Sequence, residues 1–318
     1  MQNTDSCPCS DAPRSKRATI LGKEVALKSY VCSQDGVHYR PKEGRIRLQL
    51  SILLTRYCDA HCPFCIAAPT DDPRTLSLAA LEKTLRLLRE EDCVRGISIT
   101  GGEPFSRPEL LNEAVSLIFQ LFGYGMEITI DTNGTGLEHL KDIRDLAHVD
   151  TVHISRHHWL DEKNDALFGR PMPTAKALRE AILSVGIRDL FVLNCMLLKG
   201  FVETPEDVHR YLDFAIETGA PKVSFITGTP VNEFVRQRRV LYEDVLRGDD
   251  PTLLFTRGYR DYSFCRCQDG VYASPLGKLI EFYGRHSEPG GCEYCRGLAL
   301  TPEGKLTAGF GGMVLYQA

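Results

Sequence analysis

The chain has 318 residues, of which 43% are hydrophobic and 25% are charged, and its formal net charge is −4. This balance is ordinary for a globular protein and argues against a disordered or fibrous chain. The small negative charge gives no support to general nucleic-acid binding, and no apolar run reaches the roughly 20 residues of a membrane span. The amino-terminal stretch lacks the apolar segment of a signal peptide, so we expect a cytoplasmic protein without membrane contacts.

Residues 1–44 are interpreted as an N-terminal arm, and strand and helix patterns alternate from residue 45 onward. The expected strands span 45–55, 96–100, 126–132, 151–155, 190–198 and 222–227. The expected helices span 76–91, 108–122, 137–147, 174–186 and 204–219. This alternation predicts an α/β fold with a parallel sheet and right-handed crossovers, either an open doubly wound sheet or a partial (β/α) barrel.

Polar segments follow the first four expected strands. A group of three cysteines follows the first strand, and the next three strands lead into TGGEP (100–104), DTNGT (131–135) and SRHHW (155–159). Functional residues of parallel α/β folds gather at the carboxyl ends of the strands. We therefore expect the four segments to form one site at the mouth of the sheet or barrel.

The carboxyl-terminal part loses its helical periodicity from about residue 259. We expect a small domain at 259–318 after a core domain at 45–258. It contains an internal repeat, because residues 265–284 align with 292–311 at an offset of 27. Each copy has a cysteine pair, a glycine and then a predicted β-hairpin with Pro and Gly in its turn.

The chain contains twelve cysteines, and their short spacings without a signal peptide favour metal binding over disulfides. Four of them form two pairs that would close one site suited to zinc or to an iron–sulfur cluster: Cys265, Cys267, Cys292 and Cys295. Another group stops at three: Cys58, Cys62 and Cys65. A cubane cluster held by three thiolates keeps one iron open for a further ligand.

The Cys-x3-Cys-x2-Cys spacing at 58–65, with Phe64 before the last cysteine and GGEP after the next strand, resembles the radical S-adenosylmethionine (SAM) superfamily. The resemblance covers residues 45 to about 230 and implies a partial (β/α)6 TIM-like barrel. It also implies an enzyme in which a reduced [4Fe–4S] cluster cleaves SAM, and a 5'-deoxyadenosyl radical abstracts hydrogen from the substrate. A reductant such as flavodoxin or ferredoxin would be its partner.

The same resemblance assigns roles to individual residues. Cys58, Cys62 and Cys65 would hold the cluster, whose open iron would bind the amino and carboxylate groups of SAM. The other implied SAM contacts are Phe64, Gly101, Gly102, Glu103, Thr132, Asn133, Ser155 and Asn194.

Residues 44–58 and 292–306 resemble a narrower group, the molybdopterin-precursor cyclases and related enzymes with auxiliary clusters in SPASM or twitch domains. Gly309 stands where the cyclases have a third auxiliary cysteine, and the chain ends in GGMVLYQA rather than in a glycine pair. These departures argue against the cyclase reaction. They favour an auxiliary site with four thiolates that holds a second [4Fe–4S] cluster or zinc.

We therefore expect a radical SAM enzyme that acts on a small biosynthetic molecule. One alternative is the same chemistry on a ribosomally synthesised peptide, although the segment before the first strand is short for a peptide-recognition domain. An alternative of another class is a non-enzymatic zinc-ribbon protein, which leaves the GGEP segment unexplained.

Four further residues are candidates for handling the substrate or a radical. Arg156, His157 and His158 suit a phosphate or carboxylate group, although one of the histidines can also pack locally. Cys195 is a candidate hydrogen donor to a product radical, although a buried free cysteine is usually a small hydrophobic residue.

Overall fold

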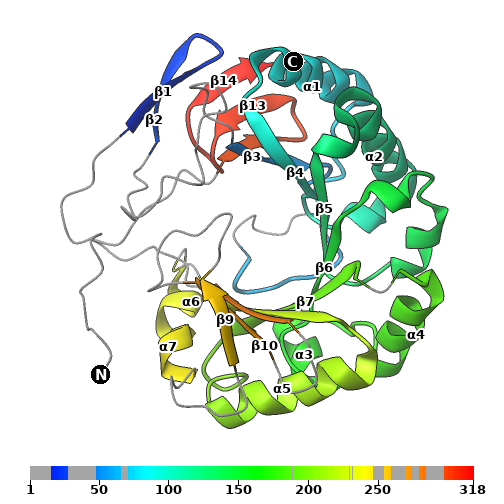
Figure 1. Ribbon diagram of the computed structural model, residues 1–318, viewed down its shortest axis with the longest axis vertical. Helices are drawn as coiled ribbons and strands as arrows, with labels where there is room; N and C mark the ends of the chain where they lie inside the picture. The colour runs from blue at the N-terminus through cyan, green and yellow to red at the C-terminus, as the bar shows by residue number, and fades with distance from the viewer. Residues whose placement is uncertain are drawn as a thin grey trace.

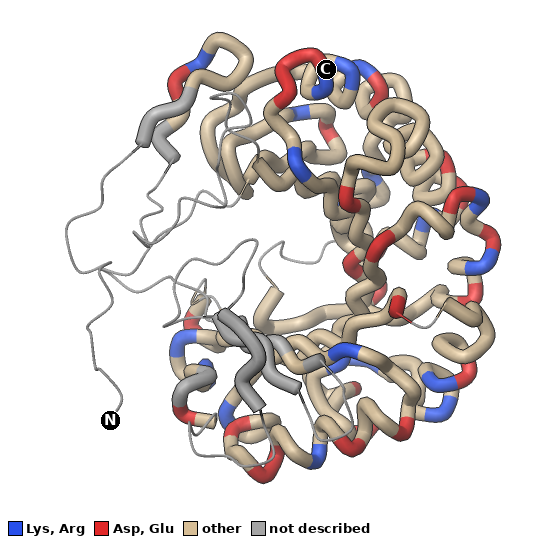
Figure 2. Tube along the Cα trace, viewed as in Figure 1, with Lys and Arg blue, Asp and Glu red and all other residues tan. Residues whose placement is uncertain are grey.

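The computed structural model describes residues 16–27, 48–65, 71–187, 189–228, 230, 232–245, 254–258, 269–273, 279–283 and 297–318. Within these residues, twelve strands form one curved sheet in the order β14-β13-β12-β3-β4-β5-β6-β7-β8-β11-β10-β9. The helices cover its convex side (Figure 1). Lysine, arginine, aspartate and glutamate lie mainly along this outer ring of helices and loops (Figure 2).

The centre of the sheet consists of six strands that are parallel and follow one another in chain order. They are β3 (Leu48–Leu53), β4 (Val94–Thr100), β5 (Glu127–Thr132), β6 (Thr151–Ser155), β7 (Phe191–Leu197) and β8 (Lys222–Thr227). The crossover helices are α1 (Leu78–Glu91), α2 (Pro108–Phe122), α3 (Asp161–Phe168), α4 (Ala175–Val185) and α5 (Pro205–Thr218). This architecture confirms the predicted partial (β/α)6 barrel.

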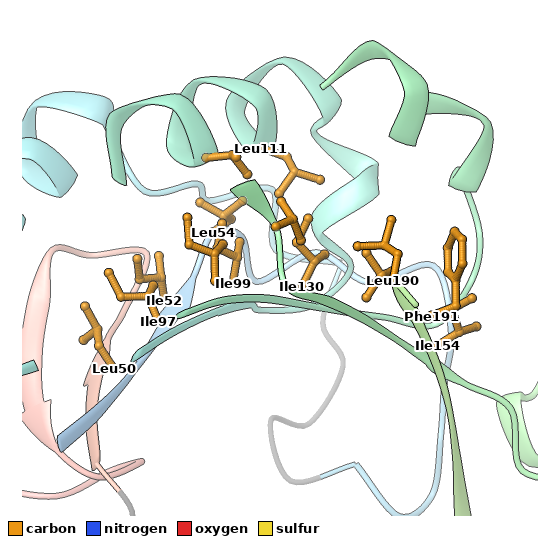
Figure 3. Close-up of a cluster of buried hydrophobic side chains, with 14 of the residues drawn as sticks. Leu50, Ile52, Leu54, Ile97, Ile99, Leu111, Ile130, Ile154, Leu190 and Phe191 are labelled. Atoms are coloured by element: carbon orange, nitrogen blue, oxygen red, sulfur yellow. The ribbon is translucent and has the colours of Figure 1, made fainter. Parts of the chain in front are cut away.

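The two faces of the central strands differ because side chains alternate across a strand. On the convex face, residues such as Ile52, Ile99 and Ile130 are fully buried against the helices (Figure 3). On the opposite face, Ser98 pairs in register with Thr129. The apolar face therefore anchors the helices, and the other face presents polar groups.

The helices begin and end at residues suited to these positions. Thr204 and Asp207 form a capping box at the start of α5, and Gly219 ends the helix in a left-handed conformation. The remaining helical segments are η3 (Pro104–Ser106), η4 (Gly123–Gly125), η5 (Leu137–Asp142), η6 (Leu146–His148), α6 (Glu233–Arg238) and α7 (Tyr242–Val245). The described helices are all too short or too polar to cross a bilayer.

The prediction of a helix at 137–147 was wrong. Two short 3-10 helices, η5 (Leu137–Asp142) and η6, replace it. The backbone N–H of Arg144 donates to Asn112 on α2 at 2.9 Å instead of to a helical carbonyl. Burial of Ile143 holds the segment in this conformation, so tertiary contacts override the local helical pattern.

The N-terminal arm contains structure that the sequence interpretation missed. Strands β1 (Lys16–Ile20) and β2 (Lys23–Leu27) form an antiparallel hairpin. Ile20 and Val25 of this hairpin are buried in the main hydrophobic core. Because the arm is mostly polar, its sequence did not indicate that Ile20 and Val25 would pack in the core.

The repeated C-terminal hairpins join the sheet at its two opposite edges. One edge consists of β9 (Leu254–Gly258), β10 (Asp269–Ala273) and β11 (Leu279–Tyr283), with β11 parallel to β8. The other consists of β12 (Gly297–Leu300), β13 (Lys305–Ala308) and β14 (Val314–Gln317), with β12 parallel to β3. The predicted hairpins are confirmed, whereas Cys265, Cys267, Cys292 and Cys295 lie outside the described residues.

The turn between β12 and β13 contacts the loop that leads into the three cysteines. Glu303 accepts a hydrogen bond from Arg56 Nε at 2.5 Å and pairs with Arg74 at 3.2 Å. The hydrogen bond from Arg56 is the main reason why the pKa of Glu303 falls from 4.5 to about 2. The β12–β13 hairpin is therefore held by ionic contacts to the segments on either side of the three cysteines.

We expect Glu303→Gln to lower the free energy of unfolding at pH 7 by about 1–2 kcal/mol, since solvent partly screens both arginines. The carboxylate stabilises the fold above its unfolded pKa, and this contribution is lost as the pH falls from about 4.5 towards about 2. Urea unfolding at pH 7 and at pH 3.5 measures whether the difference between the two proteins shrinks. Glu82→Gln is the control, because Glu82 pairs with Arg86 on the exposed surface of α1. An equal loss in both variants would contradict the role of Glu303.

Candidate functional site

The three cysteines lie on the loop that follows β3. Each is partly exposed, and the loop is held by hydrogen bonds from the Cys65 amide to the Cys62 carbonyl and from the His61 amide to the Phe168 carbonyl. Burial raises the pKa of the Cys58 thiol to about 11, and it raises the pKa of Cys62 further. Metal binding here must therefore release protons, because the thiolate is the ligand.

The three thiols are a donor set of the kind that holds an iron–sulfur cluster. Among the described residues, no three Cys, His, Asp or Glu side chains are grouped to hold one metal ion. The cysteines of a cubane bind different irons, so their sulfurs need not converge on one point. Thiolates are also the ligands that iron–sulfur clusters require. Three thiols on one loop at the carboxyl end of a strand meet this requirement.

The glycines after β4 allow that strand end to press against the cysteine loop. The amides of Gly102 and Glu103 donate to the carbonyls of Thr55 and Tyr57 at 2.7 and 2.8 Å. A Cβ atom on Gly102 would lie 1.8 Å from the Tyr57 carbonyl oxygen. Gly101 has a φ of 142° and would bring a Cβ to 2.7 Å from the Thr55 carbonyl oxygen. Only glycine fits this contact between the two segments.

Glu103 links the ends of β4 and β5 beneath the loop. Its carboxylate is buried and accepts hydrogen bonds from the Thr132 hydroxyl and the Asn133 amide at 2.7 Å, and from the Phe105 amide at 3.0 Å. Burial raises its pKa to about 8, and the three hydrogen bonds oppose this rise. These bonds engage the carboxylate within the protein, so the geometry favours an organising role for its side chain.

Thr132 and Asn133 occupy different environments, although the family resemblance gives both a contact with SAM. Thr132 is buried, and its hydroxyl donates to Glu103 and accepts from the Gly134 amide. This arrangement favours a structural role for Thr132. Asn133 is partly exposed and faces the cysteine loop, where its Nδ2 lies 3.9 Å from Cys58 Sγ and 2.7 Å from Asp59 Oδ1.

Two residues that sequence reasoning missed hold the loop from the other side. Arg170, just after α3, donates to the Asp59 backbone carbonyl at 3.1 Å and to its carboxylate at 2.7 Å. Asp59 in turn accepts from Asn133. The presence of an acidic residue inside the cysteine motif was a signal for Asp59. Arg170 lies 111 residues away in sequence and had none.

An aromatic wall stands beside the last cysteine. Phe64 contacts the His157 ring edge-on at a centroid distance of 4.8 Å, and His157 stacks on Phe168 at 5.2 Å. Ser155 and Asn194 lie opposite each other in the register of β6 and β7, and both are partly exposed. The cysteine loop, the GGEP segment, Asn133 and His157 thus meet at one rim, as the strand-end pattern predicted.

The buried side chain of Arg156 is engaged within the protein. Its guanidinium donates to the backbone carbonyls of His158 and Pro173 and to the carboxylate of Asp161, and it lies over the Phe214 ring. A substrate anion would have to displace these partners from a side chain that is 3% exposed. The contacts therefore favour a structural brace over the predicted substrate contact.

The two histidines are neutral at pH 7, because burial lowers the pKa of each to about 4. His157 Nδ1 accepts from the Met196 amide at 3.2 Å. His158 Nδ1 accepts from the Leu160 amide at 2.9 Å, and its buried Nε2 has no hydrogen-bond partner within the described segments. Neither ring carries the charge that the predicted grip on a phosphate or carboxylate needs.

The predicted role of Cys195 as a hydrogen donor does not agree with its position. Its neighbours in β7, Leu193 and Leu197, belong with it to the core on the helix side of the sheet. Asn194, which alternates with them, is partly exposed on the opposite face. Cys195 is fully buried on the wrong side of the strand for a substrate bound at the rim.

Comparisons with known proteins agree with this arrangement. The family model described as "Radical SAM superfamily" matches residues 52–215. Over 266 residues the chain is 26% identical to a "Probable GTP 3',8-cyclase" of Sulfurisphaera tokodaii, which covers 83% of this chain and 81% of that protein. It is 28% identical to "GTP 3',8-cyclase 1" of Pseudomonas aeruginosa, with 83% and 80% covered.

A solved structure with a similar fold is that of Streptococcus suis SuiB bound to S-adenosylmethionine. The TM-score is 0.55 at 18% sequence identity, and the match covers 84% of this chain. This chain spans only 62% of SuiB, which is less than two thirds of its length. At this identity the likeness concerns the fold alone.

We expect Gly102→Ala to destabilise the protein by about 2 kcal/mol or more, because the new methyl group meets a backbone carbonyl that cannot move without opening the loop. Urea unfolding of the full chain measures the loss. Gly125→Ala is the control, since a Cβ there meets no atom within 4 Å. A loss no larger than that of Gly125→Ala would show that the close contact at Gly102 does not constrain the loop.

Proposed function

Because the chain belongs to the radical SAM superfamily, we propose that it is an enzyme that reductively cleaves SAM and uses the 5'-deoxyadenosyl radical to abstract hydrogen from a small molecule. The observation that carries the proposal is the direct docking of the GGEP segment onto the cysteine loop. The Gly102 and Glu103 amides bind the carbonyls of Thr55 and Tyr57 immediately before Cys58. The two motifs therefore form one site.

Cys58, Cys62 and Cys65 would hold the [4Fe–4S] cluster that the family implies. The side-chain amide of Asn133, whose Nδ2 lies 3.9 Å from Cys58 Sγ, would donate to the thiolate and stabilise its charge. Asp59 and Arg170 fix the orientation of that amide and of the loop. The remaining ligand position would be left to SAM.

The protein contacts to SAM would come from neighbouring strand ends. Gly101 and Gly102 bring the backbone next to the loop without side chains in the way. Ser155 and Asn194, paired in register, would bind the carboxylate, ribose or adenosine from the adjacent strands. Phe64 would supply an apolar surface beside the last cysteine. These groups orient the cofactor and exclude water from it.

Burial raises the pKa of Glu103 to about 8, so its carboxyl group is mostly protonated at neutral pH unless a cation lies nearby. Its pKa of about 8 means that an ammonium group bound nearby would stabilise the ionised carboxylate. The amino group of SAM is such a cation. We therefore propose that Glu103 acts on it mainly through the field of a buried carboxylate, while Thr132 holds that carboxylate in place.

A small molecule is the substrate that the relatives support. Their printed names include GTP 3',8-cyclases and "Molybdenum cofactor biosynthesis protein 1" of Homo sapiens, which is 28% identical over 212 residues. SuiB has also been solved with its precursor peptide, but that likeness of 19% identity concerns the fold. The reductant would be a one-electron donor such as flavodoxin or ferredoxin.

We also propose an auxiliary metal site in the carboxyl-terminal part of the chain. Cys265, Cys267, Cys292 and Cys295 would hold a second [4Fe–4S] cluster or zinc. Its support is the repeat of cysteine pair and hairpin, whose two hairpins are present as β10–β11 and β12–β13. The site would relay electrons or brace the barrel.

Anaerobic reconstitution followed by addition of SAM and dithionite tests the proposed reaction. We expect 5'-deoxyadenosine from the wild-type protein and only background from Cys62→Ala. About four irons per chain would indicate one cluster, and about eight would indicate two.

Cys93→Ala is the matched control, because Cys93 is a buried thiol between α1 and β4. It should keep the iron content and the 5'-deoxyadenosine of the wild type. If wild-type protein with a full complement of iron and sulfide made no more 5'-deoxyadenosine than Cys62→Ala, the proposed function would be wrong.

A further inference from the structure

The concave face of the central sheet carries a row of hydroxyl groups. Ser51, Ser98, Thr129 and Thr151 lie next to one another in the register of β3, β4, β5 and β6. Thr129 and Thr151 share a hydrogen bond of 2.9 Å. These residues alternate with the apolar ones that face the helices (Figure 3). On these four strands, the face turned away from the helices therefore carries a row of groups that both donate and accept hydrogen bonds.

An aspartate–histidine pair stands one step further along these strands. Asp131 and His153 are opposite each other in register, and His153 Nδ1 lies 3.0 Å from Asp131 Oδ1. The Ser98 hydroxyl donates to the other carboxylate oxygen. Because an ionised carboxylate only accepts, the tautomer that fits this contact carries its hydrogen on Nδ1 and presents a lone pair on Nε2.

The pair is open although it belongs to the middle of the sheet. The side chains of Asp131 and His153 are 37% and 27% exposed, whereas the residues on the other face of the same strands are buried. Within the part of the chain that the structure describes, His153 Nε2 makes no hydrogen bond. A partly exposed histidine at the centre of a curved sheet, oriented by a carboxylate, is suited to receive a ligand.

The pair also lies next to the proposed SAM contacts. Ser155 follows His153 by two residues on β6 and therefore lies on the same face, and Asn133 follows Asp131 by two residues, just beyond the end of β5. Two residues of a strand span about 7 Å. A small molecule held at His153 would thus lie one layer deeper in the barrel than a cofactor held at the rim.

We propose that His153, oriented by Asp131, is a substrate-binding residue for a hydroxylated ring such as the sugar of a nucleoside. This inference rests on the proposed function, since it places the substrate beside the SAM site. The Nε2 lone pair requires a donor from the ligand, and the surrounding serine and threonine hydroxyls pair with further hydroxyl groups. Asp131 is the positioning residue, because it holds the imidazole in the tautomer that accepts.

Calorimetric titration of the reconstituted, SAM-bound full chain tests the proposal. The probes are guanosine, adenosine and cytidine, each compared with its 2',3'-dideoxy form, which differs only in the two sugar hydroxyls. We expect the wild-type protein to bind at least one ribonucleoside more tightly than its dideoxy form. His153→Phe should lower that preference by about five- to tenfold, which is the loss of one hydrogen bond.

Asp131→Asn should lower the same preference while leaving the dideoxy affinity and the urea unfolding curve unchanged, which a merely structural role would not do. His139→Ala is the matched control, because His139 forms an exposed pair with Asp142 on η5. The proposal is overturned if no ribonucleoside is preferred over its dideoxy form, or if His153→Phe keeps the preference.

The formation of 5'-deoxyadenosine without any probe separates this result from the proposed function. Wild type and the control His139→Ala should both form it, since His139 is exposed on η5 and pairs with Asp142. Formation of 5'-deoxyadenosine without a hydroxyl preference would overturn only the role of His153. Absence of 5'-deoxyadenosine from the fully loaded wild type would overturn the proposed function itself.

Discussion

The site depends on one buried carboxylate and the backbone contact above it. Glu103 gathers donors from β5 and its own turn, while its amide and that of Gly102 bind the segment between β3 and the first cysteine. A buried acid without these donors would be costly, and a side chain at Gly102 would prevent the contact. Gly101, Gly102 and Glu103 therefore fix the relative position of two strand ends and of the cysteine loop. The positions of Asn133 and Cys58 follow from this contact.

Much of the fold was predictable because burial leaves a periodic record in the sequence. Strands covered by helices need apolar residues on one face, and β3 and β6 show this alternation clearly. The helix expected at 137–147 does not form, because the Arg144 backbone N–H donates to the Asn112 side chain on α2 instead of to a helical carbonyl. The hairpins were visible in the repeat, but their attachment to opposite edges of the sheet was not. The place of attachment depends on which edge strands of the central sheet still have unpaired backbone groups, here β3 and β8. No local sequence pattern shows this.

The site was predictable where function requires a fixed local spacing, and not where support comes from distant residues. The cysteine spacing and the two glycines must be contiguous to work, so they form readable motifs. Arg170 reaches Asp59 from a turn 111 residues away, and Glu303 reaches Arg56 across 247 residues. For Arg156, in contrast, sequence position suggested a functional role that the structure does not favour. Its position at a strand end suggested ligand binding, yet its buried guanidinium is engaged by the loop that follows it. Residue type and rim position do not reveal which internal acceptors a side chain will meet.

The alternation of side chains along each strand that builds the core also determines which side chains can reach a bound ligand. Cys195 and Asn194 are adjacent in β7, but one is packed against helices and the other faces the concave side. His153 and Ile154 divide in the same way on β6. Shifting a strand by one residue would exchange the two sets, burying the histidine and exposing the isoleucine. The apolar residues therefore do more than stabilise the barrel, because their burial fixes the register that directs Asp131, His153 and Ser155 to one surface. A stable core and an ordered site therefore depend on the same strand register.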